Sequence, residues 1–335
     1  MTSLERVLAV FHGQQADRIP VIPIIGQAAA RLNGITMSEE LQSPETLAES
    51  RIACLKRFGY DGLYISADTW VAAEAMGAPV EYADDAPTAG TTPLLDDMQK
   101  LDQLKASDPK QDGRLPFLVK AVEIASSRSN DTFAVIANFD QSPFSLACAL
   151  RGINQLMLDV YDQPDCVTQL LDICAESVIR YAKALAEAGA HILNTGDSPA
   201  ILVGPQHYEK FALPYEQIVF DELKAYGIPT VLHICGNTTK VLSKMGQSHA
   251  TGLEIDHAVD LHTARNAVPG TMTLIGNIDP VEMLLNASPE KISSHVKSLL
   301  DESPRIGQFI LSSGCTLAPH TPPENIAAMV QVARS

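Results

Sequence analysis

Short apolar runs alternate with stretches of helical spacing along nearly the whole chain. The helical pattern is clearest at residues 165–188, where apolar side chains recur every three or four positions between Pro164 and Gly189. Runs typical of buried parallel strands occur at residues 19–25, 62–66, 133–138, 191–194, 230–234, 252–255, 272–275 and 309–312. Further helices are expected at residues 3–12, 43–58, 207–225, 238–246, 259–267, 289–301 and 323–333. The alternation predicts an α/β fold with a parallel sheet.

Eight apolar runs separated by helices predict a (β/α)8 TIM barrel, with an open doubly wound sheet as the alternative. The number of runs favours the closed barrel. We expect one barrel domain over residues 1–335, with an N-terminal helix within residues 1–20. A segment rich in Pro, Gly, Asp and Lys at about 84–116 predicts a long loop excursion after the second strand. In such barrels the chemistry lies at the C-terminal ends of the strands, so residues that follow the runs are the candidates for a site.

Composition and charge narrow the classes of function. Apolar residues make up 46% of the chain and charged residues 19%, as in globular proteins. The formal charge of −16 argues against partners that are nucleic acids or anionic membrane surfaces, because both would be repelled. We see neither an apolar run that could span a bilayer nor a signal peptide in the first ten residues. The six cysteines lack the clustered spacing of a disulfide framework, so we expect a cytoplasmic protein.

Three potential metal ligands follow two of the predicted strands. His233 and Cys235 lie two positions apart at the end of the run 230–234, and Cys315 follows the run 309–312. Imidazole and thiolate together suit zinc, and three protein ligands leave a fourth position open, as in catalytic sites. The alternative is that both cysteines are small buried apolar residues and His233 is a core histidine. The placement at strand ends favours the metal site. The other four cysteines lie in stretches of helical pattern, where a packing role is expected. They are Cys54, Cys148, Cys166 and Cys174.

Other polar residues also follow predicted strands. Asp140, Asp197 and Asn277 lie after the third, fourth and seventh runs, and Asp256 follows Glu254 by two positions on one face of the sixth. For Asp256 the plain alternative is a carboxylate that forms a salt bridge or caps the strand end. Asp140, Asp197 and Asn277 are each a candidate for orienting His233 through its second ring nitrogen or for lining a substrate pocket. The alternative for each is an ordinary polar residue in a loop.

The metal motif resembles that of a known family. His-Ile-Cys-Gly at 233–236, together with Ser-Ser-Gly-Cys at 312–315, resembles the zinc motif of the methylcobamide:coenzyme M methyltransferases, a branch of the uroporphyrinogen decarboxylase superfamily. The resemblance extends over nearly the whole chain through five further segments: 5–8, 17–20, 142–147, 276–280 and 68 with 74–77. At 142–147 the superfamily's first glycine is replaced by Ser142.

The resemblance implies a (β/α)8 barrel and a reaction. Zn2+ held by His233, Cys235 and Cys315 would activate a small methyl acceptor, a thiol such as coenzyme M. The methyl group would come from a methylcobamide, which is a corrinoid carried on a separate methylated corrinoid protein. Asp256 lies where these methyltransferases carry an acidic residue, which suggests an exchangeable fourth ligand or a proton acceptor. Asp197 lies where they carry an Asp after the fourth strand.

Other functions remain open at this stage. Tetrahydrofolate is an alternative methyl acceptor. A metal-independent lyase of the decarboxylase type would have an arginine-rich signature after the first strand, whereas residues 26–31 contain only Arg31. A non-enzymatic barrel that uses a structural zinc to dock a corrinoid protein is the third possibility, and it would require a fourth fixed protein ligand.

Overall fold

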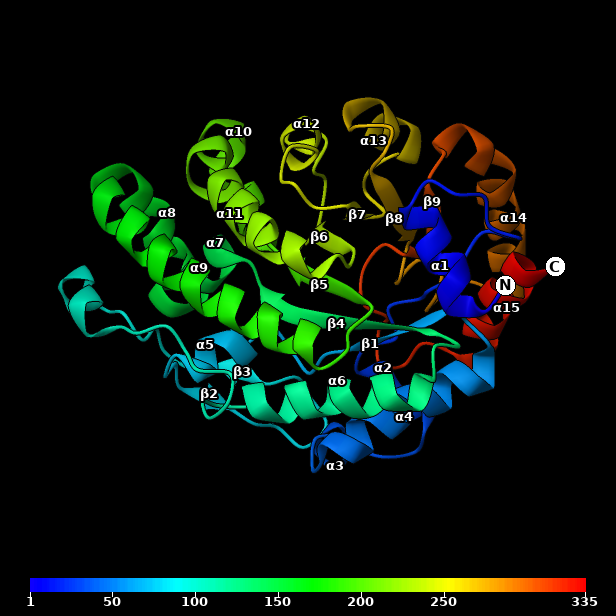
Figure 1. Cartoon of the computed structure of the whole chain (residues 1–335), viewed down its shortest axis with the longest axis horizontal. Coiled ribbons are helices and arrows are strands. Elements are labelled where there is room, and N and C mark those ends of the chain that lie inside the picture. The colour runs from blue at the N-terminus through cyan, green and yellow to red at the C-terminus, as the bar shows by residue number, and fades with distance from the viewer.

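The centre of the molecule is a parallel sheet that curls on itself (Figure 1). The computed structural model describes residues 1–335. Seven strands follow one another in the order β1-β4-β5-β6-β7-β8-β9, so each new strand pairs with the one before it. They are β1 (Gly62–Ile65), β4 (Ala134–Gln141), β5 (Ile192–Gly196), β6 (Thr230–Ile234), β7 (Gly252–Ile255), β8 (Thr273–Ile278) and β9 (Phe309–Ser313). This order, with helices between the strands, confirms the predicted barrel class.

The first predicted strand, residues 19–25, is not a regular strand, which corrects the sequence-based expectation. It contributes a single parallel bridge between Val21 and Leu311. It nevertheless lies between the two edge strands, because Ile22 N–H donates to Leu311 O (2.8 Å) and Asp61 N–H donates to Val21 O (2.8 Å). Pro20 and Pro23 lack the N–H groups that a continuous ladder needs. The segment therefore occupies the place of the eighth strand without its full pairing.

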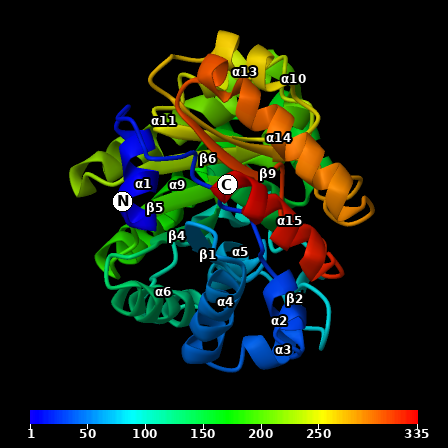
Figure 2. The same ribbon diagram turned by 90° about the vertical axis from the view of Figure 1, so that its right-hand side faces the viewer.

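An outer layer of helices covers the sheet (Figures 1 and 2). The helices of the first half are α1 (Ser3–Phe11), α2 (Ala28–Leu32), α3 (Met37–Glu40), α4 (Pro44–Phe58), α5 (Val71–Ala75), α6 (Leu115–Ser129), α7 (Pro143–Arg151) and α8 (Ile153–Asp162). Those of the second half are α9 (Pro164–Glu187), α10 (Gly204–His207), α11 (Leu213–Leu223), α12 (Leu242–Met245), α13 (Leu261–Ala267), α14 (Pro289–Ile306) and α15 (Pro323–Arg334). None of them is both long enough and apolar enough to cross a membrane.

Two predicted helices illustrate how local sequence sets the boundaries. At α4 the Ser43 side chain accepts a hydrogen bond from Thr46 N–H, and Gly59 ends the helix with a left-handed backbone (φ 78°). The predicted helix 207–225 is instead interrupted. A π-helical turn, η3 (Tyr208–Ala212), separates α10 from α11, and a 3-10 turn, η4 (Lys224–Tyr226), follows. Pro214, in the first turn of α11, removes an N–H group from the ladder at this junction.

Helix α1 closes the end of the barrel that is opposite the strand C-termini. Its apolar face joins inward-pointing strand residues in a cluster of 13 buried side chains. The cluster includes Leu4, Val7, Val10, Phe11, Tyr64, Ile136, Ile192, Val231, Ile275 and Ile310. Because this end is filled by side chains, access to the barrel axis is from the C-terminal end of the strands.

An arginine near the end of the excursion at 84–116 helps to hold it against the barrel. It contains β3 (Ala89–Gly90), which pairs with β2 (Val80–Glu81), and a 3-10 helix, η1 (Met98–Gln103). Near its end, Arg114 forms ion pairs of 2.5 Å with both Asp68 and Glu74. Asp68 lies in the loop between β1 and α5, and Glu74 lies within α5, so the end of the excursion is fixed next to the loop that follows β1.

Candidate metal centre

The three predicted ligands converge at the C-terminal end of the barrel. His233 lies near the end of β6 and Cys235 directly follows this strand, while Cys315 follows β9 by two residues. The turn at Gly314 brings Cys315 toward β7, since a Cβ at Gly314 would lie 2.5 Å from the backbone nitrogen of His257. Only glycine allows this close approach.

The ligand atoms form a compact group. His233 Nε2 lies 2.9 Å from Cys235 Sγ, and Cys235 Sγ lies 3.7 Å from Cys315 Sγ. All three atoms lie within 4.8 Å of one another. The two sulfurs are too far apart for a disulfide, whose S–S bond is about 2.05 Å. Two thiolates on one tetrahedral zinc, each at about 2.3 Å, would be about 3.8 Å apart. The donor types and the sulfur separation therefore fit zinc.

Glu254 fixes the orientation of the His233 ring. The backbone oxygen of Glu254 lies 3.3 Å from Nδ1, and its Oε2 lies 3.7 Å from the same atom. Tyr64 OH, from β1, donates a hydrogen bond to Glu254 Oε1. A partner on Nδ1 leaves Nε2 free to face the sulfurs, which is the usual second interaction of a histidine that binds a metal.

Mutual contacts polarise the histidine and cysteine. The hydrogen bond from the Cys315 thiol lowers the pKa of Cys235 to about 4, with His233 acting in the same direction and burial opposing. Burial lowers the pKa of His233, but Cys235 and Glu254 outweigh this effect and raise it to about 9. Negative charge is therefore concentrated on sulfur where a cation would bind.

Two neighbouring side chains hold the loop that carries Cys235. Ser198 Oγ accepts a hydrogen bond from Cys235 N–H (3.1 Å). The Asp256 carboxylate accepts from Gly236 N–H and from Ala258 N–H, both at 2.8 Å. Asp256 is thus engaged with backbone groups and is not a member of the three-residue cluster. Its predicted role as a fourth ligand or proton acceptor stays a prediction.

The other strand-end residues occupy three different places. Asp197 is completely buried, and its Oδ1 accepts from the N–H (2.8 Å) and hydroxyl (2.6 Å) of Ser145. Burial raises the pKa of Asp197 to about 6. Asn277 donates to Asp256 O (3.1 Å) and Val259 O (2.6 Å), so it supports the loop after β7 and does not contact His233.

Asp140 lies at a bulge in β4 and faces the cleft. Its backbone has a positive φ of 67°, and its Oδ2 accepts from Ala72 N–H (2.8 Å). The side chain is buried, which raises the pKa of Asp140 to about 8, and the neighbouring Asp68 acts in the same direction. Asp140 therefore lines the pocket, one of the two roles expected for it.

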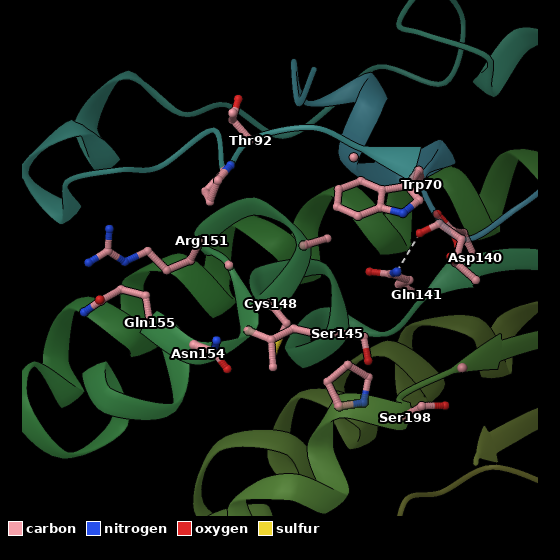
Figure 3. Close-up of a pocket in the computed structure, with 18 of the residues that line it drawn as sticks. Trp70, Thr92, Asp140, Gln141, Ser145, Cys148, Arg151, Asn154, Gln155 and Ser198 are labelled. Carbon is pink, nitrogen blue, oxygen red and sulfur yellow. Dashed lines mark hydrogen bonds between the residues drawn. The ribbon is translucent and has the colours of Figure 1, made fainter. Parts of the chain in front are cut away.

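The three candidate ligands, His233, Cys235 and Cys315, are called the metal group below. They lie at the inner end of a two-part cleft. The inner chamber, about 360 Å³, is lined by His233, Cys235 and Cys315 and also by Tyr64, Asp68, Asn138, Asn194 and Glu254. An outer chamber of about 820 Å³ adjoins it and shares Thr69, Asp140, Gly196 and Ser198 with it. Figure 3 shows the outer chamber, with Trp70, Asp140 and Gln141 on one side and Arg151, Asn154 and Gln155 on the other.

Sequence reasoning missed the roles of Tyr64, Ser198 and Glu254. A Glu on an otherwise apolar strand was a visible signal, because a buried carboxylate requires a partner. Tyr64 and Ser198 gave no comparable signal, since a tyrosine in a strand and a serine after one are common.

Comparisons with known proteins agree over the full length of the chain. The family model described as Uroporphyrinogen decarboxylase (URO-D) matches residues 2–335. The methylcobamide:CoM methyltransferase MtbA of Methanosarcina mazei is 31% identical over 340 residues, which cover 100% of this chain and 98% of the relative. A uroporphyrinogen decarboxylase of Syntrophotalea carbinolica is 28% identical, covering 87% of this chain and 84% of the relative.

The solved structures give the same result. A methyltransferase from Methanosarcina mazei superposes with a TM-score of 0.91 at 25% identity, covering 100% of this chain and 98% of that one. A B12-independent methionine synthase from Shewanella, at 13% identity and a TM-score of 0.56, shares the fold alone. The resemblance inferred from the two motifs is confirmed, and the chain belongs to the uroporphyrinogen decarboxylase (URO-D) family.

Proposed function

We propose that this protein is a metal-dependent methyltransferase that moves a methyl group from a methylated corrinoid to a small acceptor. The corrinoid is carried by a partner protein, and the acceptor is a thiol bound at His233, Cys235 and Cys315. The single observation that carries the proposal is the convergence of these three side chains, from β6 and the end of β9, within 4.8 Å at the open end of the barrel. The full-length similarity to a methylcobamide:CoM methyltransferase supports it.

The residues present fit a zinc ion, with one imidazole and two thiolates as donors. A zinc ion held by these three residues would lower the pKa of an acceptor thiol. Glu254 and Tyr64 keep Nε2 of His233 directed at the sulfurs. Ser198 and Asp256 hold the backbone on either side of Cys235. These contacts fix the donor atoms before the acceptor arrives, so little reorganisation is needed on binding.

The transfer is a displacement in which the acceptor thiolate is the nucleophile. Its sulfur forms a bond to the methyl carbon, the carbon–cobalt bond breaks, and the electron pair of that bond stays on cobalt. The thiol proton is lost to solvent when the acceptor binds. The chain contributes orientation and binding, while the corrinoid supplies the leaving group. Asp140 is proposed to shape the acceptor site as a lining residue, with Oδ2 held by Ala72 N–H. Asp197 is proposed to act from behind the wall, where its Oδ1 holds the N–H and hydroxyl of Ser145.

The decarboxylase alternative is less consistent with the cleft. Arg31, the one arginine after the first predicted strand, pairs with Asp85 (2.7 Å) and does not line the inner chamber. A porphyrinogen bearing several carboxylates would meet the carboxyl groups of Asp68, Asp140 and Glu254 there and no lysine or arginine. The methyl-transfer proposal therefore accounts better for the charges in the cleft.

The test combines metal analysis with a transfer assay. The purified protein is analysed for zinc, and demethylation of methylcobalamin is followed with 2-mercaptoethanol, coenzyme M and tetrahydrofolate in separate assays. We expect about one zinc per chain and transfer to a thiol that is lost on chelation. Transfer to tetrahydrofolate and to neither thiol would show that the acceptor is tetrahydrofolate and not a thiol. Equal activity with and without metal would overturn the proposal.

A further inference from the structure

The charges around the metal group point to a property of the acceptor. The inner chamber is lined by three carboxyl groups, those of Asp68, Asp140 and Glu254, and by no lysine or arginine. In the outer chamber the only cationic lining residue is Arg151. Its side chain is 6% exposed. It forms an ion pair with Asp159 (2.6 Å) and donates a hydrogen bond to Leu95 O (2.7 Å).

Arg114, which lies behind the inner wall, is also neutralised. Arg114 binds both oxygens of Asp68, at 2.5 and 3.1 Å, and Glu74 Oε2 at 2.5 Å. Two carboxylates on one guanidinium leave this group with net negative charge. Asp68, which separates Arg114 from the inner chamber, is itself a lining residue.

Two backbone N–H groups beside the cleft are already occupied and offer no substitute for a cation. Those of Ala72 and Ser145, in the first turns of α5 and α7, would be the natural anion donors. Ala72 N–H is already bound to Asp140 Oδ2 (2.8 Å), and Ser145 N–H is bound to Asp197 Oδ1 (2.8 Å). The side chains of Asp140 and Asp197 thus occupy these two N–H donors, which could otherwise bind a sulfonate or carboxylate.

The metal group adds no positive charge once an acceptor is bound. Two cysteine thiolates balance the charge of a divalent zinc, and His233 is then neutral. A bound acceptor thiolate makes this group negative. A second negative charge on the acceptor would therefore lie close to this negative group, in a chamber whose lining offers no lysine or arginine as counter-ion.

Resting on the proposed function, we propose that the acceptor is a thiol with no negative charge beyond its sulfur, so that the site discriminates against alkyl sulfonates such as coenzyme M. The remainder of the acceptor lies in the outer chamber. There the Trp70 ring and the uncharged side chains of Gln141, Asn154 and Gln155 offer stacking and hydrogen bonds (Figure 3). A cationic acceptor would be further favoured by the net negative charge of the Asp68–Arg114–Glu74 group and by the indole face.

The test compares three thiols of similar length but different charge on the zinc-loaded protein. They are 2-mercaptoethanesulfonate (coenzyme M), 2-mercaptoethanol and cysteamine. Affinity is measured by calorimetry and is expressed per thiolate present, because the three thiols ionise differently. Methyl transfer from methylcobalamin is measured in parallel. We expect the neutral and cationic thiols to bind about 10-fold more tightly than coenzyme M at low salt, and the difference to shrink as salt is added.

A charge variant gives a second, independent measurement. Asp68→Asn removes one carboxylate from the inner wall and leaves Arg114 less neutralised, so the affinity for coenzyme M should rise by about 3- to 10-fold relative to 2-mercaptoethanol. Glu282→Gln is the matched control, because Glu282 is exposed and lines neither chamber. It removes the same charge and should leave the affinity ratio unchanged.

The outcomes separate this inference from the function on which it rests. Coenzyme M binding as tightly as the neutral thiol, or more tightly, would overturn the inference and leave the methyltransferase proposal intact. No thiol binding at the metal, together with no methyl transfer to any thiol, would overturn both. The wild-type series decides the question even if Asp68→Asn fails to fold.

Discussion

The carboxylate of Glu254 faces the imidazole of His233, with Oε2 3.7 Å and the backbone oxygen 3.3 Å from Nδ1. The two residues are paired across adjacent strands, β6 and β7. The register of the sheet therefore places the orienting group beside the ligand. A carboxylate at this position keeps Nδ1 protonated and raises the basicity of Nε2 toward a metal.

Glu254→Gln should weaken zinc binding by about 10-fold, because the His233 ring loses the negative charge of its partner. Glu254→Ala should weaken it by about 100-fold, because the ring then loses the partner's side chain as well. Zinc affinity is measured by competition with a chelator. Glu302→Gln is the matched control, since Glu302 pairs with His262 (3.1 Å) away from the cleft. Unchanged zinc affinity in both Glu254 variants would show that the ring is held by the backbone oxygen alone.

Cys235→Ser and Cys315→Ser should each lower zinc affinity by more than about 100-fold and abolish methyl transfer, since a hydroxyl is a poor zinc ligand. Circular dichroism should stay that of the wild type, because both side chains lie at the end of the barrel and outside its two apolar clusters. Cys166→Ser, a partly exposed change on α9, controls for the substitution itself. A Cys235→Ser protein that keeps both zinc and activity would contradict the proposed centre.

Asp140→Asn should change how stability depends on pH. The pKa of Asp140 is about 8 in the folded protein, whereas an unperturbed aspartate has a pKa of about 3.8. Between these values the unfolded chain releases a proton that the folded chain keeps, so the wild type loses at most about 1.4 kcal/mol of unfolding free energy per pH unit at this site. The contribution of Asp140 to the unfolding free energy is therefore fully present below about pH 3.8 and is lost as the pH rises toward 8.

The Asp140→Asn variant lacks this titration, and asparagine tolerates the positive φ of 67° at this position. Its stability relative to the wild type should therefore increase from pH 5 to pH 7.5 in urea unfolding experiments. Asp301→Asn, an exposed change on α14, should show no such trend. A constant difference between wild type and Asp140→Asn across this range would show that Asp140 is ionised in the folded state.

Arg114→Met should destabilise the fold by about 3 kcal/mol, because it leaves Asp68 and Glu74 without their shared cation. The Asp68 and Glu74 side chains are 3% and 14% exposed, so solvent compensates little. Lys100→Met breaks a pair with Asp96 in which both side chains are at least half exposed, and it should cost less than about 0.5 kcal/mol. Urea unfolding measures both, and limited proteolysis within 84–116 should accelerate only in Arg114→Met. Equal effects of the two variants would argue against the arginine as the anchor of the excursion.

Several features of the fold follow from local sequence. Seven of the eight apolar runs are strands, and α4 and α9 match the predicted helices within a residue or two, because periodicity and capping residues act over one or two turns. The run 19–25 shows the limit of this reasoning. Its apolar character was a sound signal of burial, but Pro20 and Pro23 remove the ladder donors and reduce it to one bridge.

By itself, the sequence identified the three candidate metal ligands, and the structure brings them together. The chemistry of imidazole and thiolate and the position of these residues after strands are both local properties of the chain. Only the tertiary structure decided what surrounds them: Glu254 and Tyr64 behind His233, the capture of Arg114 by Asp68 and Glu74, and a cleft without a free cation. These contacts join residues that are far apart along the chain. They depend on strand register and on closure of the barrel, which no stretch of neighbouring residues specifies.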